Sequence, residues 1–314
     1  TNVSAEMKII GGLKLKGVFG ADIMNDTRFT RNHAVAYYSS EEATEPRPIK
    51  KENNKTSNWN SNAYLINTQL LLDYNKTFGK HTVNGLVGLT NESYTQSSNE
   101  IEKKYVDPDL GIATDETTSE PGNITGKTSV DDSNRTSITS FLGRAGYSYA
   151  DRYYAEFSFR YDGASKLPQG LSLGLFPSVS LGWRPTEESF MEFYKEKIGD
   201  LKLRASYGIL GSQAIGTYDR FTVYDVYDNS YAYNNKTVSG AGFKLGLENL
   251  TWEKTQTFNI GVDASFLQNS LTVTFDYFHK RTNDILMKPL ISSVFGTEMP
   301  MANIGKMQNQ GWDL

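Results

Sequence analysis

Few residues of this chain are of a type and spacing that could carry out a reaction. The 314 residues include no cysteine and three histidines, His33, His81 and His279, which lie far apart and share no metal-ligand spacing. Zinc sites take His and Cys at short repeated spacings, and a nucleophilic triad needs a histidine between a nucleophile and an acid. We therefore expect no catalytic residue, no cofactor and no enzymatic activity.

One acidic segment, DPDLGIATDETTSE, offers the hard oxygen ligands that calcium prefers. The candidate ligands are Asp107, Asp109, Asp115 and Glu116. Their spacing does not match an EF-hand loop, and a solvated extracellular loop explains the same residues. A calcium site therefore stays an alternative to a plain loop.

A second segment, GTYDRFTVYDVYDNSYAYNN, is rich in tyrosine among Asp and Asn. Aromatic rings stack on sugar rings and Asp or Asn side chains bind hydroxyl groups, so a lid that contacts a ligand fits this composition. Tyrosines that only extend strands above a membrane surface fit it equally well. The binding candidates are Tyr218, Tyr224, Tyr227, Tyr231 and Tyr233.

The elements that position these residues are β-strands. In RYYAEFSFRYDGASKL, residues 152–167, apolar residues alternate with polar ones, and this period of two recurs in about a dozen segments. Because successive side chains of a strand point to opposite faces, one face of each strand is apolar and the other is polar. A soluble sandwich buries such an apolar face against a second sheet, whereas a membrane barrel turns it toward lipid.

A barrel would give the two faces different surroundings. It predicts one continuous outward band that contains Phe157, Phe159, Val179, Leu181, Leu203, Ala205, Val262 and Phe275. Charges on the other face would line a conduit or pair with other groups inside the barrel, and pairing is favoured because interior polar groups need partners. The lumen-facing candidates are Arg144, Glu156, Arg160, Arg184, Lys202, Arg204, Asp263 and Asp276.

Short and long connections alternate along the chain, which places them at opposite rims. Tight turns are expected near Gly79, Asp151 and Asn269, and PTEESFMEFYKEKIGD on the same rim is long enough for a small helix. Short periplasmic turns opposite long extracellular loops are typical of outer-membrane barrels. The long loops are expected at about residues 25–62, 91–136, 211–256 and from 283 onward, and they contain Trp59, Asp115, Tyr227 and Ser293.

Composition and the chain ends narrow the class of protein. The net charge of -4 gives no basic surface for nucleic acid. Hydrophobic residues make up 38%, and no run approaches the roughly 18 apolar residues that a spanning helix needs. TNVSAEMKIIGG has no basic region before an apolar core, so we expect that a signal peptide was removed or that the chain is a fragment. The last residues, IGKMQNQGWDL, favour a fragment.

Several segments resemble one family, the SusC/RagA-type TonB-dependent transporters of the Gram-negative outer membrane. They span about residues 138–314 in the family's order, and they are specific as a set. Ala164 stands where the family usually has Ser, and residues 1–137 fit only by their pattern. The segments are FLGRAGYSYADRYYAEFSFRYDGASKL, LFPSVSLGWRPTEESFM, IGDLKLRASYGILGSQAIGTYD, LTWEKTQTFNIGVDASFLQNSLTVTFDYFHKRTNDIL and NIGKMQNQGWDL.

The resemblance implies an all-β fold, an antiparallel meander that forms part of a transmembrane barrel of about 22 strands. Residues 1–314 would then be one partial barrel domain without the plug domain and the last strands. It also implies an outer-membrane active transporter of oligosaccharides or peptides, which a SusD-like surface lipoprotein covers and TonB drives through the plug. Two alternatives stay open, a passive porin or adhesin of the outer membrane and a soluble sugar-binding β-sandwich.

Overall fold

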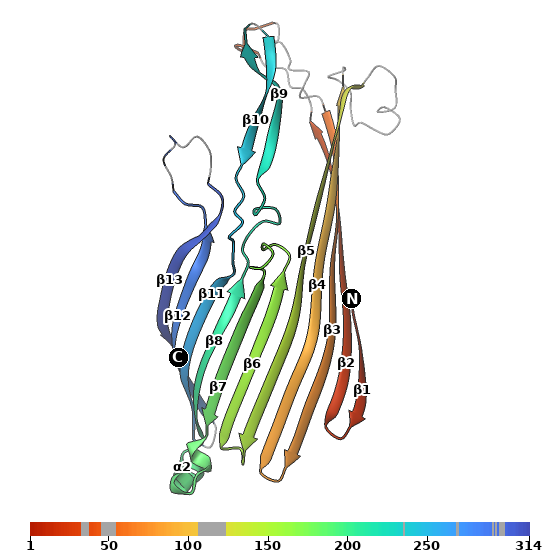
Figure 1. The fold of residues 1–314 in the computed structure, drawn as a ribbon. Helices are drawn as coiled ribbons and strands as arrows, with labels where there is room; N and C mark the ends of the chain where they lie inside the picture. The colour runs from red at the N-terminus through yellow and green to blue at the C-terminus, as the bar shows by residue number, and fades with distance from the viewer. Residues whose placement is uncertain are drawn as a thin grey trace. The chain divides into compact units, whose positions relative to one another are not determined.

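The computed structural model describes residues 1–32, 38–44, 55–105, 124–234, 236–267, 270–290, 292, 294 and 299–314 (Figure 1). The calcium candidates Asp107, Asp109, Asp115 and Glu116 lie outside these residues, as do Asn269, Ser293 and the side chain of Tyr227. Strands dominate the described chain, and the predicted all-β fold is confirmed. The strands are β1 (Asn2–Ile10), β2 (Leu13–Asn32), β3 (Lys55–Phe78), β4 (His81–Tyr105), β5 (Ile124–Tyr149), β6 (Tyr153–Ala164), β7 (Leu173–Trp183), β8 (Leu201–Ser212), β9 (Val223–Tyr233), β10 (Lys236–Lys244), β11 (Glu253–Phe266), β12 (Leu271–Met287) and β13 (Ala302–Asp313).

One sheet contains all the strands except β9 and β10. Its order is β1-β2-β3-β4-β5-β6-β7-β8-β11-β12-β13, so strands that follow one another in sequence are neighbours, and β11 lies beside β8. The ladders from β5 to β13 are antiparallel. β9 and β10 pair only with each other, as an excursion between β8 and β11. The predicted antiparallel meander is confirmed with this one excursion.

The contacts divide the chain into two compact units. The first contains Thr1, Ala21–Ile66 and Ser93–Arg135, and the second contains Asn2–Gly20, Asn67–Glu92 and Thr136–Leu314. In the first unit, Lys55 pairs with Glu102 at 2.5 Å and the Arg28 guanidinium lies 5.4 Å from the centre of the Trp59 ring. The candidate site lies entirely in the second unit.

The register gives the sheet of the second unit one apolar face and one polar face. Ala155, Leu181, Ala205, Ile260 and Tyr277 are successive cross-strand partners from β6 to β12. Directly opposite residues share a face, so all eight residues of the predicted band lie on one side of the sheet. None of the eight is buried, and Leu181 is 57% exposed. They are therefore not packed between two sheets, as a sandwich requires.

The short connections of the second unit lie at one end of its strands (Figure 1). Gly79 turns from β3 to β4 with a φ of 61°, and Ala150 and Asp151 turn from β5 to β6 with φ of 50° and 54°. Positive φ at two successive residues is the geometry of a tight hairpin turn. The expected helix between β7 and β8 is confirmed as η2 (Pro185–Glu187), η3 (Ser189–Met191) and α2 (Glu192–Lys197).

All four expected long loops are wrong in extent, because β9 and β10 lie within 211–256 and β13 lies beyond residue 283. Trp59 lies inside β3, and much of the expected loop 91–136 belongs to β4 and β5. The segment SYTQSSNEIEKKY at the end of β4 is polar at both sets of alternate positions. Because a period of two is visible only when one face is apolar, such a strand looks like a loop in the sequence.

A small apolar core lies at the long-connection end of the second unit. It joins residues from β6, β7, β12 and three connections, and the Phe176 and Trp252 rings meet edge to face at 5.2 Å. The indole Nε1 of Trp252 donates to the Ser172 carbonyl at 2.9 Å. The core residues are Ala164, Leu167, Phe176, Ile215, Leu250, Trp252 and Leu286. Within the described ranges, no helix has the length and apolar character to cross a membrane.

Candidate functional site

Arg204 is the centre of the charge network on the polar face. Its Nε and Nη2 donate to Asp263 at 2.7 and 3.0 Å, and Nη2 also donates to Asp276 at 3.0 Å. β8 supplies the arginine, and β11 and β12 supply the carboxylates. A guanidinium that binds one carboxylate through two nitrogens has a fixed orientation, so the three side chains form a rigid unit.

Gly261 makes the Arg204 network possible. It lies in β11 directly between Arg204 and Asp276 in the register. A Cβ at this position would lie 2.3 Å from Asp276 Oδ1 and 2.9 Å from Arg204 Nη2. Glycine inside a strand often marks such a close approach of neighbouring groups.

A second glycine allows a similar contact one strand pair away. Gly182 of β7 lies between Tyr154 of β6 and Arg204 of β8. Across it, the Lys202 ammonium lies 5.1 Å from the centre of the Tyr154 ring, a cation–π contact. These side chains and Glu156 line a hollow on the polar face.

The remaining strand charges are partly paired. Arg160 Nη2 donates to Ser140 at 3.0 Å and lies 3.3 Å from Asp162, which is 8% exposed. Arg144 and Glu156 are exposed on the same polar face. In the part of the chain that the structure describes, neither has an ion pair or a hydrogen bond from its side chain. These two are the charges most open to a further partner.

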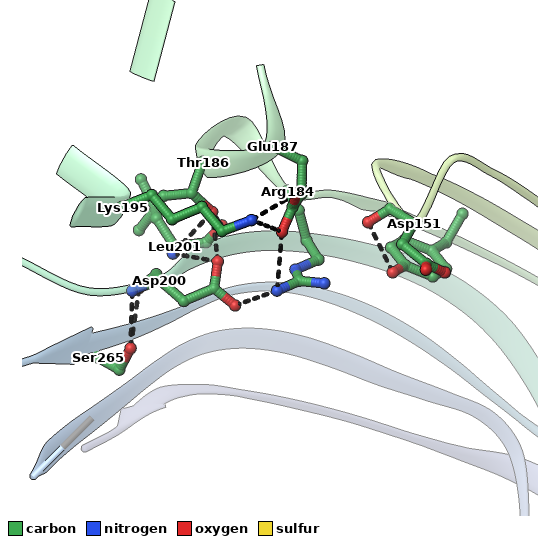
Figure 2. A network of polar contacts seen from close by, with 9 residues as sticks. Asp151, Arg184, Thr186, Glu187, Lys195, Asp200, Leu201 and Ser265 are labelled. Atoms are coloured by element: carbon green, nitrogen blue, oxygen red, sulfur yellow. Dashed lines mark hydrogen bonds and ion pairs between the residues drawn. The ribbon is translucent and has the colours of Figure 1, made fainter. Parts of the chain in front are cut away.

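Arg184 lies just beyond β7 and belongs to a separate network at the short-connection rim (Figure 2). Its Nη2 lies 2.6 Å from Asp200 Oδ2 and 3.3 Å from Glu187 Oε1, and Lys195 binds the same glutamate at 2.7 Å. Thr186, which is 2% exposed, donates its hydroxyl to Asp200 Oδ1. The network ties the helical insert to the start of β8.

The Asp200 carboxylate also fixes the backbone around it. Burial opposes its ionisation, but hydrogen bonds from Thr186 and Arg184 outweigh burial and lower the pKa of Asp200. Its Oδ1 accepts the Leu201 N–H at 3.0 Å, and its own N–H donates to the Ser265 hydroxyl at 2.8 Å. Asp200 and Thr186 carry no recognisable signal in the sequence, because their interaction depends on the fold of the insert, which residue spacing alone does not show.

The tyrosine-rich segment forms the β9–β10 hairpin and the turn before it. Tyr224 is 72% exposed and Tyr233 78% exposed, so the rings face solvent. Tyr224 lies opposite Phe243, whereas Tyr231 lies opposite Val238, on the other face of the hairpin. The structure therefore does not gather the tyrosine candidates on one surface, and Tyr218 lies outside the hairpin, before β9.

The apolar core anchors the connections that carry this hairpin. Lys166 Nζ donates to the Ile215 carbonyl at 3.1 Å, and Arg220 Nη1 donates to the Leu167 carbonyl at 3.3 Å. Thr251 and Asn303 exchange two hydrogen bonds of 2.9 Å on the return to the sheet. These contacts hold both ends of the hairpin in place against the core. Across the described ranges, His, Asp and Glu form no group of three or more that could hold a metal ion.

The sequence matches a known protein family. Residues 12–314 match the family model for the TonB dependent receptor-like β-barrel. TonB-dependent receptor P39 of Formosa agariphila is 34% identical over 254 residues, which are 80% of this chain and 23% of that protein. TonB-dependent receptor SusC of Bacteroides thetaiotaomicron is 30% identical over 264 residues, 81% of this chain and 25% of that protein.

Solved structures show the same fold. A structure of the RagAB peptide transporter matches with a TM-score of 0.81 at 22% identity, over 99% of this chain and 33% of that chain. The outer membrane transporter YddB from Escherichia coli matches with a TM-score of 0.62 at 15% identity, over 99% of this chain and 38% of that chain. The chain spans about a quarter of the curated relatives that it matches. It belongs to the TonB-dependent receptor family, and it resembles the SusC type within that family.

Proposed function

We propose that the protein containing this chain is an outer-membrane TonB-dependent transporter that imports oligosaccharides or peptides together with a SusD-like lipoprotein. The chain would supply a portion of the barrel wall, with a plug domain and further strands supplied by the rest of the protein. It would work by binding and movement and without chemistry of its own.

The observation that carries the proposal is the pair of unlike faces on one sheet. Apolar residues such as Phe157 (50% exposed) and Leu181 (57%) cover one face, and no layer of the described residues packs over them. Exposing so much apolar surface to water is unfavourable, and lipid is the solvent that removes the cost. The opposite face then borders the lumen.

The polar face supports a plugged barrel in preference to an open pore. Arg204 pairs with both Asp263 and Asp276, so these charges link neighbouring strands of the wall. Arg144 and Glu156 are exposed on that face and free of ion pairs within the described residues. We assign these two as contacts of the plug, through which TonB would act.

The β9–β10 hairpin supports a covering partner. A two-stranded hairpin is marginally stable alone in water, and this one exposes aromatic rings on both faces. A lipoprotein that closes over the extracellular mouth would cover one face, and the substrate would contact the other. Aromatic rings beside Asp and Asn suit both sugars and peptides.

Cysteine labelling of intact cells tests the location and orientation, because the chain has no native cysteine. A membrane-impermeant maleimide should label Tyr227→Cys and Tyr233→Cys but not Asn269→Cys or Asp151→Cys. Labelling only at Asn269→Cys and Asp151→Cys would show that the chain crosses the membrane in the opposite orientation. Uptake of oligosaccharide and peptide panels by cells with and without the gene, and with and without TonB, tests the transport class.

A passive porin or adhesin is the remaining alternative of a different class. It would share the barrel but would take up or bind its ligand equally well when TonB is absent. The soluble sugar-binding sandwich does not fit the fold, because the predicted band is exposed on one sheet.

A further inference from the structure

Three basic side chains gather on the apolar face near the far ends of β11, β12 and β13. They are Lys254, Arg281 and Lys306, and all three are exposed. Arg281 and Lys306 line one hollow together with Met307 and Gln308. We refer to these three residues as the basic cluster.

The register fixes the face on which the basic cluster lies. Val262 and Phe275 of the apolar band are directly opposite each other, and so are Gln256 and Arg281. Because each residue of the second pair lies an even number of residues from the residue of the first pair on its own strand, both pairs lie on the same face of the sheet. Arg281 is opposite Gln308 in turn, which places Lys306, two residues earlier, on this side. Lys254 lies two residues before Gln256 and shares the side as well.

The distance along the strand places the basic cluster at a membrane surface. Arg281 lies ten residues beyond Leu271, the first residue of β12. At about 3.3 Å per residue this is about 33 Å along the strand, or about 25 Å along the membrane normal for a strand tilted by about 40°. About 25 Å is the height of the apolar band of an outer-membrane barrel, so Arg281 lies where the lipid headgroups begin.

The residues around the basic cluster agree with this level. Ile260, Tyr277 and Trp312 form a cross-strand row just before it, and Trp312 is 67% exposed. Aromatic residues of this kind mark the boundary between acyl chains and headgroups. His279 and Gln310 follow in the next row beside Phe258, and Gln256, Arg281 and Gln308 form the row after it, so polar residues replace apolar ones over these two rows.

The basic cluster has no acidic partner in the described chain. None of its three residues forms an ion pair. The acidic residue of β12 that is nearest to Arg281 in the sequence is Asp284, which lies where the register of the β12–β13 ladder shifts. Asp284 also forms no ion pair there. Among the described residues, these three exposed positive charges therefore have no ion-pair partner.

We propose that the basic cluster binds the phosphate of a glycolipid headgroup in the outer leaflet, such as lipid A. The proposal rests on the proposed function, because it requires the apolar face to contact the membrane and the long connections to lie outside. The acyl chains would lie along the apolar band while the phosphate meets Arg281, Lys306 and Lys254. Arginine offers two parallel donors to a phosphate, and lysine offers a compact charge.

Lipid binding to the purified full-length protein tests the proposal. Native mass spectrometry would compare phosphorylated lipid A, the same lipid without phosphate, and inorganic phosphate. The Arg281→Gln/Lys306→Gln variant should bind phosphorylated lipid A about ten-fold more weakly or worse, because each basic residue near an anionic surface contributes to affinity. Lys280→Gln is the matched control, since Lys280 is exposed on the same strand but on the polar face, and it should bind like the wild type.

Three results would overturn the proposal. They are unchanged lipid affinity in the Arg281→Gln/Lys306→Gln variant, equal binding of the lipid with and without phosphate, and inorganic phosphate that binds as tightly as the lipid. The charge-preserving Arg281→Lys/Lys306→Arg variant should retain binding, which separates charge from folding. Heat-modifiable migration of the protein in outer-membrane fractions is measured separately and reports whether the membrane barrel is folded. Loss of this migration would count against the proposed function, whereas normal migration with unchanged lipid binding would count only against the lipid site.

Discussion

Arg204 reaches Asp276 across a strand that separates them. Nη2 of Arg204 lies 3.0 Å from Oδ2 of Asp276, although β8 and β12 each pair with β11 and not with each other. The residue between them is Gly261, which has no side chain to block the contact. The salt bridge therefore links β8 to β12 across β11, and it can form because Gly261 has no Cβ.

Gly261→Ala should break this bridge and destabilise the barrel by about 1 to 3 kcal/mol, because a partly buried charge loses its partner. Thermal unfolding of the full-length protein, followed by heat-modifiable migration, measures the loss. Asp276→Asn should cost much less in the Gly261→Ala background than in the wild type, since the bridge is already absent. Gly17→Ala is the control, because a Cβ there meets nothing within 4 Å. Full additivity of the two substitutions would contradict the proposed role of Gly261.

The sequence predicts the faces of the sheet well and the partners on each face poorly. Alternation directly reports the side on which Arg204 or Leu181 lies, because the side-chain period of a strand is two. It does not report register, so the pairing of Arg204 with Asp263 and Asp276 required the structure. A glycine at a polar position of β11, such as Gly261, was the available signal for a close contact.

Other features of the fold could not be predicted from the sequence, for different physical reasons. The end of β4 and the start of β5 have polar residues at both sets of alternate positions in the sequence and therefore lack the alternation that identifies a strand. The apolar core joins Leu167, Leu250 and Trp252 from connections far apart in sequence, and no local pattern links them. The basic cluster likewise assembles only when β11, β12 and β13 are placed in register.

Arginine substitutions on the two faces should have opposite outcomes. Ala205→Arg and Val262→Arg each place a charge on the apolar band and should cost about 2 to 4 kcal/mol near the bilayer midplane. Ser206→Arg, one residue away on the polar face, should cost little. Denaturant unfolding from lipid vesicles would measure all three. A large cost at Ser206 together with a small cost at Ala205 would reverse the assignment of the faces.

Acidification should loosen the helical insert between β7 and β8. The pKa of Asp200 is lowered in the folded protein, so the unfolded state binds the proton more readily. The stabilisation is therefore complete above the ordinary carboxyl pKa of about 4 and is lost as the pH falls through the lower folded value. Hydrogen-exchange protection factors of residues 184–200, measured against pH and corrected for the intrinsic exchange rate, would show the change in the wild type. In Asp200→Asn the protection should already be low at neutral pH and should not change with pH in this range, and a loss of protection parallel to that of the wild type would contradict the assignment.

The two faces of the β9–β10 hairpin should contact different partners. Tyr224→Ala/Phe243→Ala removes the rings from one face, and Tyr231→Ala/Tyr233→Ala removes them from the other. Each stacked ring contributes about 0.5 to 1.5 kcal/mol beyond its buried area, so each double variant should lower the affinity of its own partner by about five-fold to 100-fold. Because the main sheet does not include the hairpin, both variants should keep the wild-type unfolding temperature.

Calorimetry on the full-length transporter distinguishes the two faces when the lipoprotein and the ligand are titrated separately. We expect one double variant to weaken the lipoprotein and the other to weaken the ligand, since a thin hairpin between two partners presents one face to each. Phe193→Ala is the control, because this ring is also exposed but lies on α2 at the short-connection rim. If neither double variant changes either affinity, the exposed rings do not contact the lipoprotein or the ligand, and the hairpin is not the cover of the transport path.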